Sequence, residues 1–251
     1  MKKTIIVIIF TSFFLISKQG LAQEVYAKIT YKKKSNTILK KSDEKETIVT
    51  KMLKDAHDNM NNLEYTLLFN EKYALFKEVD KMELDKQTGI SYTLSKLFGE
   101  TNGVFFTDRF SGKTMLQKEF ESDLFLIENS KITDWNLTQE KKMIGNYLCY
   151  KATKKDTFIN SSGEKNPYEV IAWYTPKLPY PYGPTKYNGL PGLILELNNR
   201  QANIYVSKIE LNPKEKNKIS KLKKGISVTK KEYDNIVMGL ATDFRKKHKR
   251  N

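Results

Sequence analysis

The feature that most constrains the fold is an alternation of apolar and polar residues with a period of two. In residues 64–70 (EYTLLFN), Tyr65, Leu67 and Phe69 fall on one side of an extended chain. Such alternation is typical of a half-buried β-strand. It returns, between turn residues such as Ser111-Gly112 and Gly145-Asn146, in 25–31, 73–79, 104–110, 114–120, 123–129, 135–142, 146–155, 168–175, 193–197 and 203–211. The chain is therefore predicted to be mainly β (α+β), built on a curved antiparallel sheet.

One helix is expected near each end of this sheet. Near the N-terminus, Asp43 and Glu46 resemble a capping signal. They precede an apolar set at helical spacing: Ile48, Val49, Met52, Leu53, Ala56, Met60 and Leu63. Near the C-terminus, Thr229 and Glu232 form a capping box. It precedes Tyr233, Ile236, Val237, Leu240 and Phe244 and then a basic tail. The segment 81–103 is compatible with either a strand or a short helix.

The first residues predict export. Lys2 and Lys3 precede an apolar run from Ile5 to Ile16, and Gly20-Leu21-Ala22 resembles a signal peptidase site. The run is shorter than the ~20 residues of a membrane-spanning helix, so a retained anchor is the weaker interpretation. We expect a signal peptide at 1–22 and a single domain at 23–251, located in the periplasm or outer cell envelope.

The charge is strongly positive. The full chain carries +15, and removing residues 1–22, with three lysines and no acid, leaves +12. Nucleic acid is the usual partner of such a chain, but expected export and the lack of a nucleic-acid motif argue against it. Two explanations of the positive charge remain. The lysines form solvated surfaces without a ligand, or they attract the protein to anionic membranes or polymers of the envelope.

Residues with catalytic potential are sparse. A nucleophilic Cys149 would need a nearby base, and the two histidines, His57 and His248, lie in the two predicted helices. Cys149 itself lies within a predicted strand, where a buried structural thiol is expected. Two separate histidines also make a zinc site improbable. The sequence thus predicts no enzyme, no cofactor and no metal.

The segment 176–191 is a rigid loop. It holds five of the seven prolines, interleaved with Tyr180, Tyr182 and Tyr187. Proline fixes φ and prevents a helix here. Gly189 and Gly192 enclose Pro191 and predict a tight turn or a close backbone approach. This turn would deliver Leu193, Leu195 and Leu197 to the core.

This segment resembles the GLPGLI family, exported proteins of the Bacteroidota. The residues Gly189, Leu190, Pro191, Gly192, Leu193 and Ile194 match its naming motif without a mismatch. The upstream AWYTP (172–176), Gly183-Pro184, Trp135 and the strand around Cys149 fit the same pattern. The resemblance covers residues 100–211 well and implies no activity, because none is established for the family.

A weaker likeness concerns the half-barrel carriers of the periplasm, of the lipoprotein-sorting type, which keep an apolar cavity. It leads to the hypothesis of a carrier for an apolar ligand, a lipid or a lipidated protein. We expect Trp173, Tyr180, Tyr182, Tyr187 and Leu190 to form the rim of the cavity, although these residues would also suit a loop held by tyrosine packing. The alternative function is a scaffold that binds an anionic envelope polymer or a partner protein through its basic surface.

Overall fold

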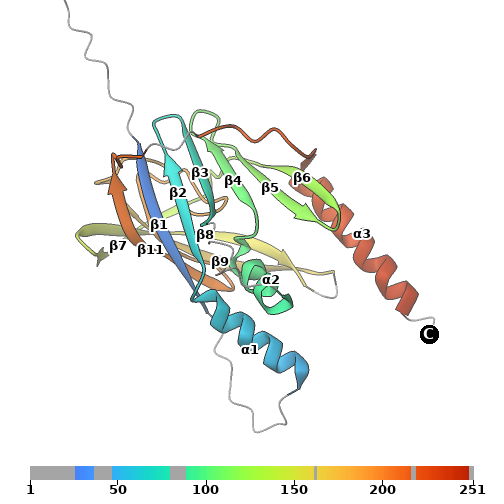
Figure 1. The fold of residues 1–251 in the computed structure, drawn as a ribbon. Helices are drawn as coiled ribbons and strands as arrows, with labels where there is room; N and C mark the ends of the chain where they lie inside the picture. Colours follow the sequence, from blue (N-terminus) through green and yellow to red (C-terminus); the bar gives the residue numbers. More distant parts are fainter. Residues whose placement is uncertain (1–25, 37–46, 80–88, 161–162, 216–218, 249–251) are drawn as a thin grey trace, which may run out of the picture.

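The computed structural model describes residues 26–36, 47–79, 89–160, 163–215 and 219–248 (Figure 1). The predicted signal peptide at 1–22 and the expected cap residues Asp43 and Glu46 lie outside these ranges.

Twelve strands form one sheet within the described residues. Their order across it is β12-β6-β5-β4-β3-β2-β1-β11-β10-β9-β8-β7. The bounds are β1 Ala27–Ser35, β2 Glu64–Phe69, β3 Tyr73–Glu78, β4 Val104–Asp108, β5 Thr114–Phe120, β6 Asp123–Asn129, β7 Asn136–Ile144, β8 Tyr147–Ile159, β9 Lys165–Thr175, β10 Leu193–Asn198, β11 Ala202–Leu211 and β12 Ile226–Thr229. The prediction of a mainly β fold with a curved sheet is confirmed.

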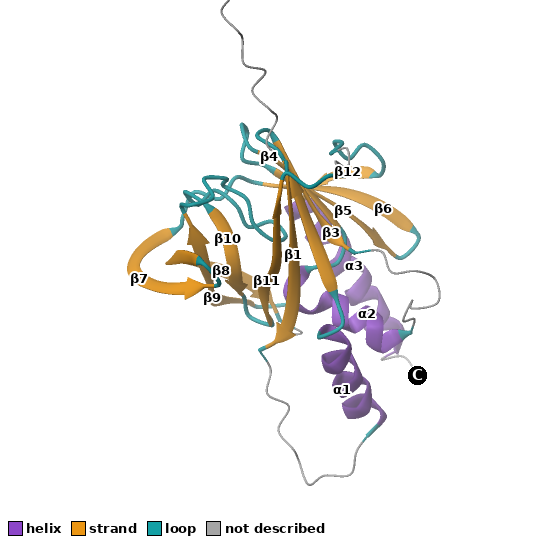
Figure 2. Ribbon diagram, turned by 60° about the vertical axis from the view of Figure 1, so that its left-hand side comes forward, coloured by secondary structure: helices purple, strands orange, loops and turns teal. Residues whose placement is uncertain are grey.

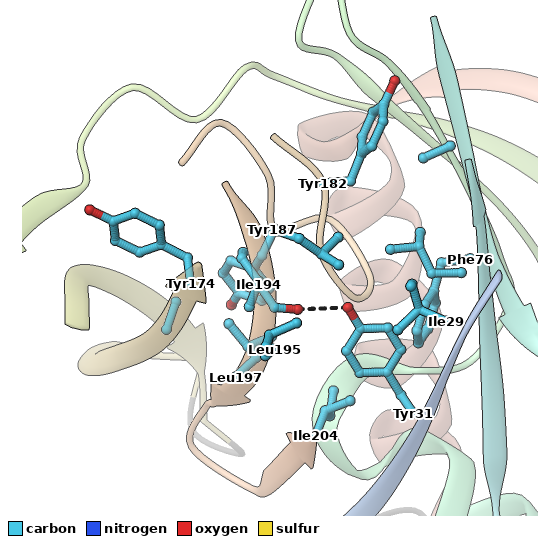
Figure 3. Packing of buried hydrophobic residues seen from close by; sticks show 14 of the residues in the cluster. Ile29, Tyr31, Phe76, Tyr174, Tyr182, Tyr187, Ile194, Leu195, Leu197 and Ile204 are labelled. Carbon is cyan, nitrogen blue, oxygen red and sulfur yellow. Dashed lines mark hydrogen bonds between the residues drawn. The ribbon is translucent and has the colours of Figure 1, made fainter. Parts of the chain in front are cut away.

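The sheet curls so that its two halves enclose a common core. In β1, Ala27, Ile29, Tyr31 and Lys33 alternate on one face, and all four are buried. The hydroxyl of Tyr31 donates to the carbonyl oxygen of Ile194 on β10 at 2.6 Å (Figure 3). Since alternate strand residues share a face, this bond shows that the inner face of β1 meets the start of β10.

Three α-helices and one short 3-10 helix complete the described structure. Their bounds are α1 Ile48–Met60, α2 Ile90–Leu97, η2 Phe98–Glu100 and α3 Lys230–His248. Figure 2 shows α1, α2 and α3 together on one side of the strands β1–β6. The helices expected near both ends are therefore present, and the segment left open at 81–103 contains α2.

Lys33 ties β1 to the second helix. Its fully buried ammonium donates to the carbonyl oxygens of Ser95 and Phe98 and to Oγ1 of Thr101, at 2.7–2.8 Å. These acceptors lie in the last turn of α2, at the start of η2 and just after η2, where helix carbonyls lack partners within the helix. A lysine in the middle of a lysine run thus serves as a helix cap inside the core.

The structure corrects the sequence analysis in three places. The sheet is mixed rather than purely antiparallel, because β12, a short strand that was not predicted, pairs parallel to β6. Helix α1 is capped by Thr47, whose side chain accepts from the backbone of Thr50. Only the later part of the α1 apolar face is buried: Ala56 and Met60 are inaccessible, whereas Ile48 is 81% exposed, since the start of α1 projects beyond the sheet (Figure 1).

Candidate functional site

A pocket of about 370 Å³ lies between the sheet and α3. Alternation along β5 aims Leu116, Lys118 and Phe120 into it, and Ile127 of β6 lines the same space. The remaining lining residues are Leu97, Glu100, Asn102, Phe105, Glu119, Asn129, Lys186, Lys230, Tyr233, Asp234 and Val237. Its volume falls within the range of ~300–1,000 Å³ that is typical of small-molecule sites.

Helix α3 covers this pocket through few side chains. Tyr233 is buried and packs edge-on against Phe120 and Phe125, with ring centroids 6.0 and 5.4 Å apart. The helix starts at the predicted capping box, in which Oγ1 of Thr229 accepts from the backbone of Glu232 at 3.2 Å. The side chains of Leu240 and Phe244, which were expected to extend the apolar stripe, lie outside the described residues.

Lys118 is a cation on the apolar wall of the pocket. Its Nζ lies 4.8 Å from the ring centroid of Tyr233. Within the described residues, no carboxylate forms an ion pair with it and no acceptor takes a hydrogen bond from it. Burial, and then the nearby charge of Lys230, lower the pKa of Lys118. The charges of Glu100 and Asp234 act to raise this pKa, but neither carboxylate forms an ion pair with Lys118 among the described residues.

A second, more polar pocket of about 290 Å³ adjoins the first. Both are lined by Asn129, Lys186 and Lys230. The second is completed by Ser130, Lys131, Ile132, Asp134, Lys154 and Asp156. The two together form a site with an apolar part beneath α3 and a polar part rich in lysine.

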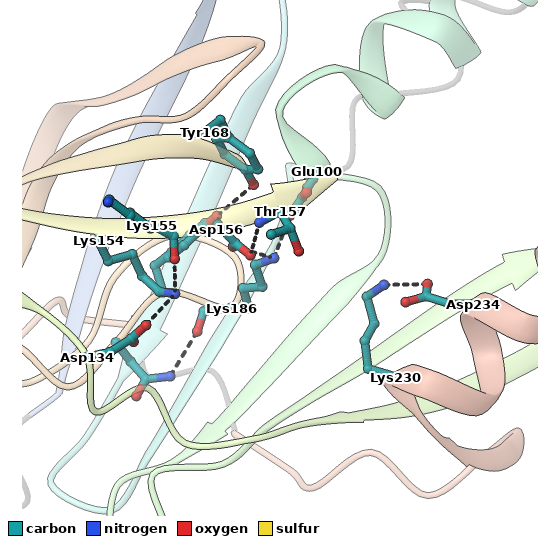
Figure 4. A network of polar contacts seen from close by, with 12 residues as sticks. Glu100, Asp134, Lys154, Lys155, Asp156, Thr157, Tyr168, Lys186, Lys230 and Asp234 are labelled. Atoms are coloured by element: carbon teal, nitrogen blue, oxygen red, sulfur yellow. Dashed lines mark hydrogen bonds and ion pairs between the residues drawn. The ribbon is translucent and has the colours of Figure 1, made fainter. Parts of the chain in front are cut away.

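Lys186 stands between the two parts of this site. Its Nζ lies 3.0 Å from Glu100 and 3.2 Å from Asp156, while Lys230 pairs with Asp234 on α3 (Figure 4). Burial opposes the charge on Lys186, but Glu100 and Asp156 outweigh it and raise the pKa of the ammonium. Lys186 therefore stays charged at the junction of the pockets.

The proline- and tyrosine-rich loop positions Lys186 from within the core. Tyr187 is fully buried, and its hydroxyl donates to Oδ2 of Asp156 at 3.1 Å. Burial raises the pKa of Tyr187, so the phenol keeps the proton that it donates. Because Asp156 also holds Lys186, the loop and the polar part of the site form one network.

Glycines allow the loop to pack this tightly. A Cβ at Gly192 would lie 2.2 Å from the carbonyl oxygen of Thr175, and one at Gly183 would lie 2.7 Å from the carbonyl oxygen of Tyr187. Gly189 has a φ of +90°, which favours glycine. The predicted tight turn is thus present, and Leu193, Leu195 and Leu197 are all buried as expected.

The five predicted rim residues occupy different environments. Tyr182, Tyr187 and Leu190 are buried in the core, and Tyr180 packs on Phe69 with ring centroids 4.9 Å apart. Trp173 lies on the face of β9 opposite to the buried Ala172. Nζ of Lys142 lies 4.4 Å from the centroid of its ring. None of the five lines either of the two pockets above. The structure groups four of them around the loop and separates Trp173 from these four.

The other residues singled out in the sequence lie apart from the pockets. Cys149 is buried, and its burial raises the pKa of the thiol to about 11. His57 is half-buried on α1, and the side chain of His248 lies outside the described residues. No cluster of three metal-binding side chains occurs among the described residues. None of the described helices is long and apolar enough to cross a membrane.

Residues 154–196 match a family model described as "Protein of unknown function (Porph_ging)". This stretch runs from β8 to β10 and contains the rigid loop. No curated protein matches the chain.

Solved structures offer a distant likeness. Two structures of PNGF-II, in P21 and C2 space groups, match 85% of this chain at 14% identity, with TM-scores of 0.49 and 0.48. The match covers 33% of each PNGF-II chain, so this chain spans about a third of their length.

The sequence analysis missed the pocket although its parts were visible. Tyr233 and Val237 belong to the predicted stripe of the last helix, and Leu116 and Phe120 to a predicted strand. The missing information was that α3 lies over β5 and β6, which are more than a hundred residues earlier in the chain. The available signal was Lys118, a charged residue between Leu116 and Phe120 on one face of a predicted strand.

Proposed function

We propose that this chain is an exported, non-enzymatic binding protein of the cell envelope, of the GLPGLI type, that holds an apolar ligand beneath α3. The observation that carries the proposal is the pocket of about 370 Å³, whose walls include Leu116, Phe120, Ile127 and Tyr233. Export is supported by the signal-like residues 1–22, and the family assignment by the hexapeptide 189–194.

A non-enzymatic role is supported by the state of Cys149. A nucleophilic cysteine requires the thiolate. Because burial raises the pKa of this thiol to about 11, the thiolate is scarce at neutral pH. The polar cluster around Lys186 is neutralised by Glu100 and Asp156, which favours a structural or ligand-orienting role.

The alternative, a scaffold for an anionic polymer, rests on the net charge of +15. Against it, many lysines on strands, helices and loops pair with carboxylates: Lys32, Lys96, Lys113, Lys142, Lys151, Lys154, Lys186, Lys208 and Lys230. Polymer binding through exposed charges would weaken sharply with salt, because the Debye length is ~8 Å at physiological ionic strength. Binding in an apolar pocket would persist.

The test is organic extraction followed by mass spectrometry of protein purified without detergent from its native envelope. We expect a stoichiometric apolar molecule from the wild type and little or none from L116W, whose indole fills the pocket. The matched control is L137W on the exposed edge strand β7, which should retain the ligand. An extract that is empty for the wild type, even after gentle purification, would contradict the proposal and favour the scaffold.

A further inference from the structure

The side chain of Lys118, in the pocket beneath α3, is surrounded by apolar groups. Leu116 and Phe120 flank it on the same face of β5, because alternate residues of a strand share a face. Its direct cross-strand partner on β6 is Phe125, which is buried. Nζ of Lys118 lies over the ring of Tyr233 on α3, 4.8 Å from its centroid. The immediate neighbours of this amine are thus aliphatic and aromatic.

The charged form of Lys118 receives little support from the protein. Among the described residues, no carboxylate forms an ion pair with it and no acceptor takes a hydrogen bond from it. Glu100, which lines the same pocket, pairs with Lys186. Asp234 pairs with Lys230 on α3 (Figure 4). Burial and the nearby charge of Lys230 lower the pKa of Lys118, and the two carboxylates offset this only in part. The neutral amine is therefore favoured here more than at the surface.

An amine with these surroundings is suited to act as a nucleophile. A lysine is activated when it is desolvated in an apolar pocket or lies next to another cationic group. Lys118 meets both conditions, since apolar side chains surround it and the charge of Lys230 is close enough to lower its pKa. The electrophiles that a neutral lysine traps reversibly are aldehydes and ketones, with which it forms a Schiff base.

We propose that the pocket beneath α3 captures an apolar aldehyde or ketone as an imine with Nζ of Lys118. This proposal rests on the proposed function and adds the class of ligand. The neutral amine attacks the carbonyl carbon and forms a carbinolamine. The carbonyl oxygen then leaves as water with the two protons of the amine, so that a C=N bond replaces the C=O bond and no oxidant or reductant is needed. The apolar walls hold the hydrocarbon part of the ligand and keep water from the imine.

The experiment makes the capture permanent by reducing the imine. The full chain, freed from any co-purified ligand, is incubated at neutral pH with dodecanal and cyanoborohydride, and the alkylated lysines are located by peptide mass spectrometry. We expect Lys118 to be alkylated at least about tenfold faster than Lys54 on the exposed surface of α1, because a bound aldehyde reacts in an effectively unimolecular step. With propanal, which offers the pocket much less apolar surface, this preference should shrink strongly.

Two variants separate the amine from the pocket. L116W fills the pocket and keeps the amine, so alkylation of Lys118 should fall to the rate of Lys54. The matched control, L137W on β7, should leave the preference for Lys118 unchanged. K118R removes the amine and keeps the pocket, so it should bind dodecanol, which has the same chain without a carbonyl, as tightly as the wild type does. Isothermal titration calorimetry measures the binding of dodecanol, and circular dichroism establishes that each variant is folded.

The outcomes distinguish this proposal from the one on which it rests. If dodecanol binds the wild type but dodecanal alkylates Lys118 no faster than Lys54, the imine is overturned while the apolar pocket stands. A preference for Lys118 that survives in L116W, or that is as large with propanal as with dodecanal, also overturns the capture of an apolar ligand. If neither dodecanol nor dodecanal binds and the organic extract of the native protein is empty, the proposed function fails and the imine fails with it.

Discussion

Lys33 shows how far one side chain can depart from the behaviour suggested by its sequence context. It lies in a run of three lysines, yet it is fully buried and satisfied by three acceptors around α2 and η2. Burial lowers the pKa of Lys33 from 10.5 to about 7, although the charge of Glu78 acts to raise it and Lys96 acts to lower it. The alternation along β1 places Lys33 on the same face as Ile29 and Tyr31, which is the core face. The sequence analysis did not use this signal, because lysines usually lie at the surface.

The burial of Lys33 predicts a pH-dependent stability. Between pH 7 and 10.5 the unfolded chain binds more protons at this residue than the folded chain, so the free energy of unfolding rises with pH. K33M removes this rise and leaves three acceptors without their donor, which costs about 1–3 kcal/mol at neutral pH. The destabilisation of K33M relative to the wild type should therefore grow from pH 7 to pH 10.

Urea unfolding at several pH values measures this difference. K54M, on the exposed surface of α1, serves as the control and should change the free energy of unfolding by less than about 0.5 kcal/mol. A K33M destabilisation that stays constant or shrinks as the pH rises would contradict the described role of Lys33.

The close packing of Gly192 predicts that its replacement destabilises the fold. A methyl group there would lie 2.2 Å from the carbonyl oxygen of Thr175, and that oxygen belongs to backbone that cannot easily move. G192A should lower the free energy of unfolding by about 1–3 kcal/mol or more. G239A, in an open position on α3, should instead raise it by about 0.5–1 kcal/mol, because alanine favours helix. Thermal or urea unfolding measures the change for both variants. If G192A and G239A change the free energy of unfolding equally, the tight packing at Gly192 is contradicted.

Helices and strands could be predicted from the sequence where a pattern among neighbouring residues marks them. The alternation of apolar residues located eleven of the twelve strands, and the capping box at Thr229 located the start of α3. Strand β12 was missed because it is four residues long, mostly exposed and paired in parallel to β6. The exposed start of α1 was misjudged because periodicity reveals a potential apolar face but not whether another element covers it.

Helix α3 should be the element most easily detached from the sheet. Its described apolar contacts with the sheet centre on Tyr233, with Val237 beside it. Y233A should lower the local opening free energy of α3 by about 2 kcal/mol, within the usual range for a lost core contact. Hydrogen exchange should accelerate in α3 and β12 and stay unchanged in β1–β3. The control is M238A on the exposed side of the same helix, and acceleration spread over the whole chain would contradict this prediction.

At the scale of the molecule, the curled sheet does two things that the sequence could not reveal. One half is filled by the chain's own loop: Tyr182 packs on Phe69 of β2, and Tyr187 bonds to Asp156 of β8. The half at β4–β6 leaves room beneath α3. The rigid loop and the pocket beneath α3 are thus two separate features, linked through Asp156 and Lys186.

The most direct test of the proposed binding pocket is photo-crosslinking with an apolar probe. A fatty acid with a diazirine at the end of its chain is bound to the native protein, irradiated and mapped by peptide mass spectrometry. The pocket beneath α3 predicts labelled peptides that contain Leu116, Ile127 or Tyr233, and no label in L116W. Labelling concentrated at 180–190, and undiminished in L116W, would place the ligand at the loop and contradict the pocket.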